Sequence, residues 1–191
     1  MKYRKIVLIT FIVISLLLFG CANETPEEAP GEDTEEDAES TASIVDGEAA
    51  FREAIRESGT WIIITTSDLN FRRDLVVEGE FWDNDDESRE LYRKIALYAQ
   101  DEDRNVSERY TVTAPLMYIK SPNTNIQGGT FEGDLYIEAD GFTITDATID
   151  GNVYFANEEY QSTFDLNDDG EITGDIEIEE NIGDVMETAG G

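Results

Sequence analysis

TFEGDLYI, at Thr130–Ile137, is the stretch of sequence that decides the fold, because close copies of it return at short intervals. It recurs as TIDGNVYF at residues 148–155, eighteen residues later, and more loosely as EITGDIEI at residues 171–178, after a further twenty-three. A short, nearly fixed period of apolar segments with glycine turns is typical of a solenoid. In such a fold each turn of the chain cannot bury its own apolar row, but stacked turns share one core.

Within each copy the apolar residues alternate, as they do in a β-strand with one buried face. The expected inward rows are Phe131, Leu135 and Ile137; Ile149, Val153 and Phe155; and Ile172, Ile176 and Ile178. The same spacing extends backwards, from Leu135 to Met117 and from Ile144 to Ile126. We therefore predict an all-β domain that is a small parallel β-helix of four to five coils, about 18 residues each and right-handed. An antiparallel β-sandwich is the alternative, which explains the strands but not their constant register.

A short helix is expected before the strands. Residues 47–58 form an amphipathic pattern that predicts a helix capping the N-terminal end of the stack, with Asp46 as N-cap and Gly59 after its end. Its apolar stripe is Ala50, Phe51, Ala54 and Ile55. Runs of β-branched residues at 61–66, 74–77 and 110–113 predict strands, whereas residues 88–100 fit either a helix or a loop entering a strand at Ile95.

Four segments carry a resemblance to known proteins: LYIEADGFTITDATIDGNVYF, GTWIIITTSDL, DLVVEGEF and KSPNTNIQGGTFEGD. Together they resemble a family of uncharacterised bacterial lipoproteins over residues 60–160. The coil length is similar to that of polymer-forming β-helical scaffold proteins, and the helix-then-strand opening resembles the caps of pectate-lyase-like β-helices. The resemblance implies a fold and a surface location, but it implies no functional residue.

The N-terminus reads as an export signal. Three positive charges in MKYRK precede a fourteen-residue apolar run from Ile6 to Phe19, which is the plan of a secretory signal peptide. As a helix this run is only about 21 Å long, too short for the roughly 30 Å of a permanent membrane span. Leu18, Gly20 and Cys21 resemble a lipobox, and in that family the cysteine is lipidated, for example with palmitate, and becomes the new N-terminus. Residues 1–21 are thus the predicted signal peptide, and lipidated Cys21 is the predicted anchor to the cell membrane or outer membrane. Ala22 carries no signal for retention at an inner membrane.

Composition limits the chemistry. Cys21 is the only cysteine and there is no histidine, so an internal disulfide, a thiol nucleophile and the commonest general base are excluded. Without the signal, ten basic and 44 acidic residues remain, a formal charge of −34. Because such a surface repels phosphate, nucleic acid is not an expected partner. The acidity indicates either a solvated surface or one that binds or bridges cations.

The charge distribution also divides the chain. Residues 22–43 contain many acids and no bulky apolar side chain, so they are predicted to form a disordered, extended linker. Residues 44–180 suffice for one domain with one core, the predicted β-helix. Residues 181–191 are predicted to be a flexible tail.

Tyr118, Tyr136 and Tyr154 occupy the same place in three successive copies and are predicted to form an outward ladder. An exposed aromatic strip of this kind stacks on sugar rings or docks a partner, and this gives the alternative function of a glycan-binding module. The other interpretation is a ladder that only stabilises the stack.

Residues 165–173 resemble the start of an EF-hand calcium loop, with Asp165, Asn167, Asp169 and Glu171 as candidate Ca²⁺ ligands. The twelfth position of the motif is Ile176, where that loop needs an acid. A polar loop that joins two coils and holds the five extra residues of this repeat explains the same segment without metal.

These features together favour a non-catalytic, membrane-anchored surface lipoprotein that acts as a structural, adhesive or assembly scaffold. Its expected partners are the membrane, through the lipid, and either an envelope glycan or further copies of itself. A polysaccharide lyase-like enzyme is a weaker alternative, since its carboxylates would be Asp134, Asp146 and Asp150 and its basic residue Arg109 or Lys120.

Overall fold

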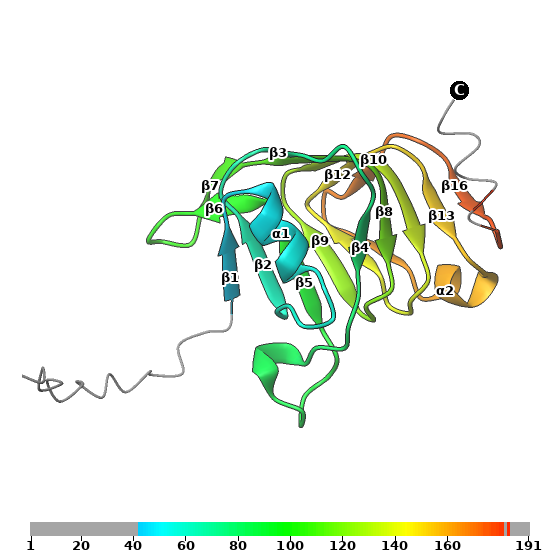
Figure 1. The fold of residues 1–191 in the computed structure, drawn as a ribbon, viewed down its shortest axis with the longest axis horizontal. Helices are drawn as coiled ribbons and strands as arrows, with labels where there is room; N and C mark the ends of the chain where they lie inside the picture. The colour runs from blue at the N-terminus through cyan, green and yellow to red at the C-terminus, as the bar shows by residue number, and fades with distance from the viewer. Residues whose placement is uncertain (1–41, 182, 184–191) are drawn as a thin grey trace, which may run out of the picture. The chain divides into compact units, whose positions relative to one another are not determined.

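The computed structural model describes residues 42–181 and residue 183, and this part of the chain consists mostly of β-strands (Figure 1). The predicted signal peptide with Cys21, most of the predicted acidic linker and most of the predicted tail lie outside the described residues. The first strand begins at Ala42, two residues before the predicted start of the domain. Among the described residues, no helix is long and apolar enough to cross a membrane.

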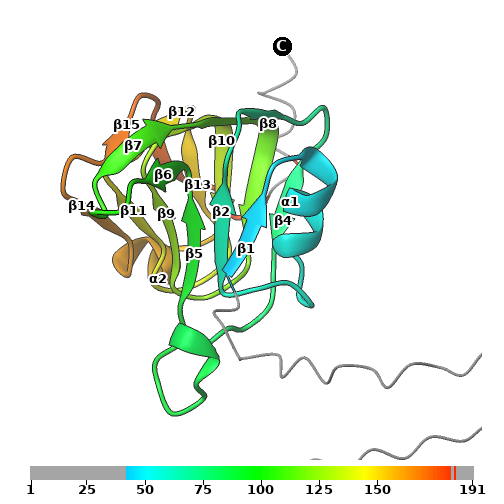
Figure 2. The same ribbon diagram turned by 90° about the vertical axis from the view of Figure 1, so that its left-hand side faces the viewer.

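One sheet has six strands, which pair in parallel in the order β1-β2-β5-β9-β11-β14 (Figure 2). Its strands are β1 (Ala42–Val45), β2 (Ile62–Thr65), β5 (Arg93–Ala96), β9 (Thr124–Gln127), β11 (Thr143–Thr145) and β14 (Asp165–Asn167). The predicted strand in 61–66 is therefore confirmed. Residues 88–100 enter a strand at Arg93, as the second of their two interpretations expects.

The other large sheet has eight strands, all of whose pairings are parallel. They are β3 (Leu69–Asn70), β4 (Leu75–Val77), β8 (Thr111–Ile119), β10 (Thr130–Ile137), β12 (Thr148–Asp150), β13 (Val153–Phe155), β15 (Glu171–Ile172) and β16 (Ile176–Ile178). Only the small hairpin of β6 (Tyr98–Gln100) and β7 (Val106–Arg109) forms an antiparallel ladder within the described part. The alternative of an antiparallel β-sandwich is therefore wrong.

The predicted eighteen-residue register is confirmed in both sheets between Met117 and Phe155. The earlier repeats are longer, because Ile62 pairs with Lys94 after thirty-two residues and Leu75 pairs with Met117 after forty-two. Met117 pairs with Leu135, which pairs with Val153, and in the other sheet Ile126 pairs with Ile144. Stacked side chains of this kind fill the core between the sheets, where Phe131, Leu135, Ile137, Ile149, Val153 and Phe155 are all completely buried. The repeat thus places one apolar row directly over the next.

The sequence predicts that the five extra residues of the last repeat lie in the polar loop, and this prediction is wrong for most of them. Ile144 pairs with Leu166, twenty-two residues on, so four of the five enter before β14. They accommodate the helix α2 (Glu158–Ser162), where the side chain of Asn157 caps the backbone N–H of Tyr160. Ile149 pairs with Ile172 after twenty-three residues, so the loop after β14 adds only one.

Glycine recurs where the last three coils of the eight-stranded sheet bend between their two halves. A Cβ atom on Gly133 would lie 1.8 Å from the carbonyl oxygen of Ala114, one on Gly151 would lie 2.1 Å from that of Gly133, and one on Gly174 would lie 2.5 Å from that of Gly151. Successive turns therefore touch backbone to backbone at this corner, and only glycine leaves room for the contact.

The residue after each of these glycines links one coil to the next. Asp134 accepts a hydrogen bond on Oδ1 from the backbone N–H of Asn152 at 2.8 Å, and Asn152 in turn accepts one from the N–H of Asp175 at 2.9 Å. These side chains satisfy amides that the bend removes from the regular strand pairing. The sequence pattern of glycine followed by Asp or Asn thus has a physical cause at each of its two positions.

The N-terminal end of the stack carries helix α1 (Glu48–Ala54). The helix is shorter than the predicted 47–58, and its N-cap is Gly47 and not Asp46, with no side-chain cap. Of its predicted stripe, Phe51, Ala54 and Ile55 are buried in the core, while Ala50 is exposed.

Arg93 ties this helix to the stack. Its side chain is fully buried and donates to the carbonyl oxygens of Ala54 at 2.7 Å and Arg56 at 3.1 Å, as well as to that of Glu78. The guanidinium also lies 4.1 Å from the centre of the Phe81 ring. Burial lowers the pKa of Arg93 to about 10, which still leaves it charged at neutral pH. The carbonyl of Ala54, the last residue of α1, is thus satisfied from inside the core as well as by the backbone N–H of Thr60.

Candidate functional site

The C-terminal end of the stack differs from its other layers because its apolar row is exposed. Leu166, Ile176 and Ile178 have exposed fractions of 44%, 44% and 40%. Their partners in the preceding coil, Ile144, Val153 and Phe155, are completely buried. The sequence placed Ile176 and Ile178 in a shared inward row; the row exists, but among the described residues no further strand covers it.

The polar ladder, by which we mean Asp134, Asn152 and Asp175 at the glycine corner, ends in the same coil. Asp175 stands one coil beyond Asn152 and two beyond Asp134, whose side chains each accept an amide of the following coil. Among the described residues no following coil brings an amide to the carboxylate of Asp175. Strands β14, β15 and β16 are also the last strands of their sheets, so each has a pairing edge without a described partner. We refer to β14, β15 and β16 as the terminal coil.

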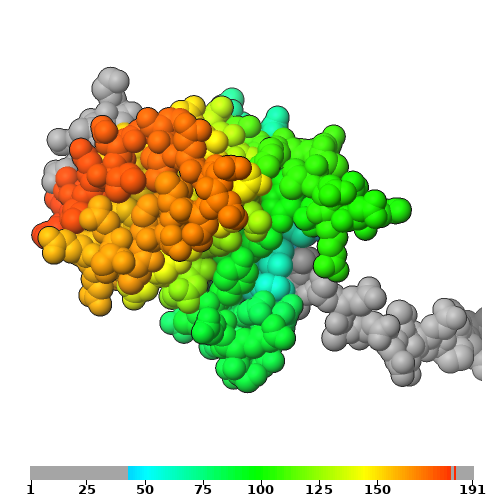
Figure 3. Space-filling view, turned by 180° about the vertical axis from the view of Figure 1, so that it is seen from behind, coloured from blue at the N-terminus to red at the C-terminus, as the bar shows by residue number. Residues whose placement is uncertain are grey.

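This end is strongly acidic. Residues 165–180 include eight acids and neither lysine nor arginine. In Figure 3 the terminal coil, in orange, forms a broad face at one end of the described part, away from the green β6–β7 hairpin. The terminal coil therefore combines exposed apolar side chains, free strand edges and a negative field.

The structure brings the three predicted ladder tyrosines into register. Tyr118 pairs with Tyr136, and Tyr136 with Tyr154, on the outer side of the eight-stranded sheet. However, Tyr136 is only 2% exposed and Tyr154 only 7%, and both pack with Leu116 in a cluster separate from the main core. The expected exposed aromatic strip is therefore wrong for these two residues, and only Tyr118 is partly accessible.

Contacts of the ladder are those of a packed cluster. The rings of Tyr118 and Tyr136 meet edge to face with centres 6.1 Å apart, and the Tyr136 hydroxyl donates to the carbonyl oxygen of Glu179 at 2.9 Å. Burial raises the pKa of Tyr136, and the nearby charges of Glu138 and Glu179 raise it further. Burial likewise raises the pKa of Tyr118. The ladder thus fastens the residues that follow β16 to β10.

The calcium-like stretch forms the corner between the two sheets. Asp165 and Asn167 belong to β14 and Glu171 to β15, with Asp168 in the left-handed conformation at the turn (φ 52°). The Asn167 side-chain amide donates to both carboxylate oxygens of Asp165 at 3.1 Å. Among the described residues, which include all four candidate ligands, no three acidic side chains gather closely enough to hold a metal ion. Calcium binding at Asp165, Asn167, Asp169 and Glu171 stays a prediction from the motif alone.

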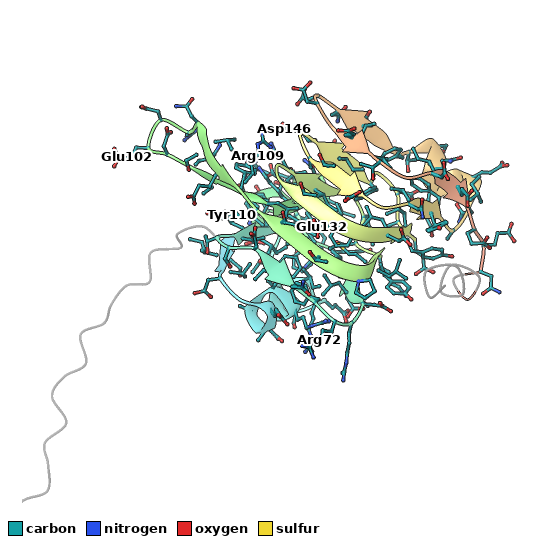
Figure 4. The ribbon with its side chains drawn as sticks, turned by 90° about the horizontal axis from the view of Figure 1, so that it is seen from above. Arg72, Glu102, Arg109, Tyr110, Glu132 and Asp146 are labelled. Atoms are coloured by element: carbon teal, nitrogen blue, oxygen red, sulfur yellow. The ribbon has the colours of Figure 1, made fainter. Side chains whose placement is uncertain are left out.

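Arg109 and Asp146 lie side by side although they are thirty-seven positions apart in the sequence (Figure 4). Arg109 donates to the Asp146 carboxylate at 2.7 Å and to its backbone carbonyl at 2.9 Å. Both residues line a polar cleft of about 300 Å³ that also includes Tyr110 and Asp169. The sequence singled out both residues but could not pair them, because the β6–β7 hairpin that carries Arg109 interrupts the repeat.

The remaining lyase candidates are engaged elsewhere. Asp134 accepts the hydrogen bond from the backbone N–H of Asn152 in the polar ladder. Asp150 accepts one from the hydroxyl of Thr173 at 2.8 Å, and Lys120 forms an ion pair with Glu138 at 3.1 Å. The structure therefore does not gather these residues into one site.

No protein-family model, curated protein or solved structure matches this chain.

Tyr136→Phe should lower the free energy of unfolding by about 1 kcal/mol at about pH 8, because it removes the hydrogen bond to Glu179. A tyrosine whose pKa is raised in the folded protein stabilises it fully below its unfolded pKa of about 10, and this contribution is lost as the pH rises through the folded pKa. Urea unfolding at about pH 8 and about pH 11 should therefore show the gap between the two proteins narrowing at the higher pH. An equal gap at both pH values would contradict the assigned environment of Tyr136.

Proposed function

We propose that this chain is a membrane-anchored surface lipoprotein whose domain, a small right-handed parallel β-helix, acts as a non-catalytic assembly scaffold. Lipid on Cys21 holds the protein at the membrane, and the acidic linker keeps the domain away from it. The lipobox-like sequence and the resemblance to uncharacterised bacterial lipoproteins support the anchor. The assembly role rests mainly on the exposed apolar row of the terminal coil.

Three features support the β-helix. The strands pair in parallel with their neighbours one repeat away, both sheets share the eighteen-residue register over residues 117–155, and the chain passes from one sheet to the other in every repeat. The bend at Gly133 and Gly151 divides the eight-stranded sheet into two faces, so each coil has three sides.

The two ends of the stack suggest how copies join. α1 and Arg93 occupy the N-terminal end, whereas Leu166, Ile176 and Ile178 are exposed on the terminal coil. Two copies that meet through their terminal coils would pair free strand edges and bury these apolar side chains from both partners. Because the same surface serves both copies, the contact is self-complementary and closes at a dimer.

Charge opposes this contact and makes it depend on salt. Each terminal coil carries eight acids within residues 165–180, so two of them repel one another in dilute buffer. Screening shortens the range of this repulsion from about 30 Å at 0.01 M salt to about 3 Å at 1 M, whereas apolar burial persists. Assembly is therefore strongest in concentrated salt.

Sedimentation velocity of the mature chain, carrying Cys21→Ser so that no lipid is attached, tests this. The parent protein should be mostly monomeric at about 0.05 M NaCl and dimeric at about 1 M. The double variant Ile176→Asp/Ile178→Asp should stay monomeric at both, because charge replaces the apolar contact.

Val76→Asp is the matched control, since Val76 is a 37% exposed apolar residue of β4, far from the terminal coil in sequence and sheet order. It should dimerise like the parent. Persistent monomers of the parent in 1 M salt, or equal dimerisation of the double variant, would refute assembly through the terminal coil.

The anchor has a separate test in the host cell. Cys21→Ser removes the thiol that would carry the lipid, so the protein should move from the detergent phase to the aqueous phase when membranes are partitioned with Triton X-114. Mass spectrometry of the parent should find acyl chains on a peptide that begins at Cys21. A parent peptide that begins elsewhere, or an unlipidated Cys21, would contradict the lipoprotein assignment.

A further inference from the structure

The outer face of the six-stranded sheet changes from apolar to polar along the stack. On β1 and β2, Ile44 and Ile64 pair in one row that continues to Ala96 of β5. The same row continues through Gln127 and Thr145 to Asn167 at the other end. Ile44 is 72% exposed, the largest value among the exposed large hydrophobic residues of the described part. An apolar surface thus lies on the outside of the molecule, at the end opposite the terminal coil.

The β6–β7 hairpin turns part of this surface into a groove. The groove has a volume of about 420 Å³ and is lined by Ile62, Ile64, Lys94, Ala96, Tyr98, Ala99 and Gln100. Its floor comes from β2 and β5 and one wall from β6, which are seen from this side in Figure 2. The volume exceeds by more than twofold the roughly 150 Å³ of an apolar cavity that holds benzene.

One charged side chain lines the groove. The Lys94 ammonium lies 2.9 Å from the hydroxyl oxygen of Tyr98, to which it donates, and 5.3 Å from the centre of the Tyr98 ring. This contact uses one of the three N–H donors of the ammonium and leaves the Tyr98 hydroxyl hydrogen available to a second acceptor. The groove therefore offers an apolar floor with a positive, hydrogen-bond-donating group at its side.

The segment that precedes β1 in the sequence does not supply an occupant for the groove. Residues 22–41, which lead into β1, contain no Val, Ile, Leu, Met or aromatic residue, so they cannot fill an apolar floor. The charge of Lys94 selects a ligand with an anionic head, and the floor of Ile62, Ile64 and Ala96 selects an aliphatic chain. A mostly apolar concave site with a few convergent polar groups is the usual form of a small-molecule site.

We propose that this groove binds an amphipathic anion, a free medium-chain fatty acid, with its carboxylate at Lys94 and Tyr98 and its chain along Ile62 and Ile64. The site does not depend on the terminal coil, and its variants differ from those that test assembly. Longer chains bind more tightly, by about tenfold for each two added methylenes as long as the groove accommodates them.

Titration calorimetry with sodium decanoate below its micelle concentration tests the site on the mature chain carrying Cys21→Ser. One decanoate should bind per chain. Lys94→Met should weaken binding about tenfold through loss of the charge, and Ile64→Asp should abolish it. Val76→Asp, which places the same substitution on a distant exposed residue, should bind like the parent, and decanol should bind the parent about as weakly as decanoate binds Lys94→Met.

A second measurement covers the case in which Ile64→Asp does not fold. Amide chemical shifts of the parent protein, followed during titration with decanoate, should change at residues 62–64 and 94–100. No binding, shifts centred on the tyrosine cluster, or an unchanged affinity in Lys94→Met would each overturn the proposal. So would a dimer at low salt that Ile44→Asp dissociates, because a second copy would then occupy the groove.

Discussion

Backbone contact between successive coils at the glycine corner is the constraint on which the rest of the structure depends. Gly151 leaves only 2.1 Å between the site of a Cβ atom and the carbonyl oxygen of Gly133, so the spacing of the coils is set there. Because the coils meet at this distance, the backbone N–H of Asn152 donates to the side chain of Asp134, and the side chain of Asn152 accepts from the backbone N–H of Asp175. The same spacing places Val153 over Leu135 in the core and Tyr154 over Tyr136 outside it. A single repeated pattern of glycine and Asp or Asn thus coordinates the core, the polar ladder and the outer tyrosine cluster.

The two ends of such a stack cannot be equivalent. The proposed function depends on the difference between them, because the N-terminal end is covered and the C-terminal end is exposed. At the N-terminal end, Arg93 carries a buried charge that is compensated by the carbonyls of Ala54, Arg56 and Glu78. At the C-terminal end the rows simply stop, and apolar side chains remain at the surface among many acids. An exposed row of this kind is an aggregation hazard, and negative charge is one way in which proteins manage it. In the proposed function, the acidic terminal coil permits association only where salt screens the charge.

The periodic part of the chain could be read from the sequence, and the parts that interrupt the period could not. The register of Leu135 over Met117 and of Ile144 over Ile126 follows directly from the sequence spacing. Parallel strands in successive repeats of equal length place residues eighteen apart over one another. The sequence does not reveal helix α2, because five residues give no helical period, and it predicts the extra length in the following loop instead. The burial of Tyr136 and Tyr154 was missed because alternation within a strand says which side a residue faces, but not what covers that side. The pairing of Arg109 with Asp146 and the groove beside Lys94 depend on the β6–β7 hairpin, which lies outside the repeat.

The most direct measurement of the central claim is the free energy of unfolding of Gly151→Ala, compared with that of Gly47→Ala. Gly151 does not have a positive φ, so its variant isolates the close approach of the coils from backbone strain. A Cβ atom on Gly47 would meet nothing within 4 Å, which makes it the matched control. Gly151→Ala should lose about 3 kcal/mol, the upper part of the range for overpacking, and Gly47→Ala less than about 1 kcal/mol. Equal stability of Gly151→Ala and the parent protein would contradict the claim that the glycine corner sets the spacing of the coils.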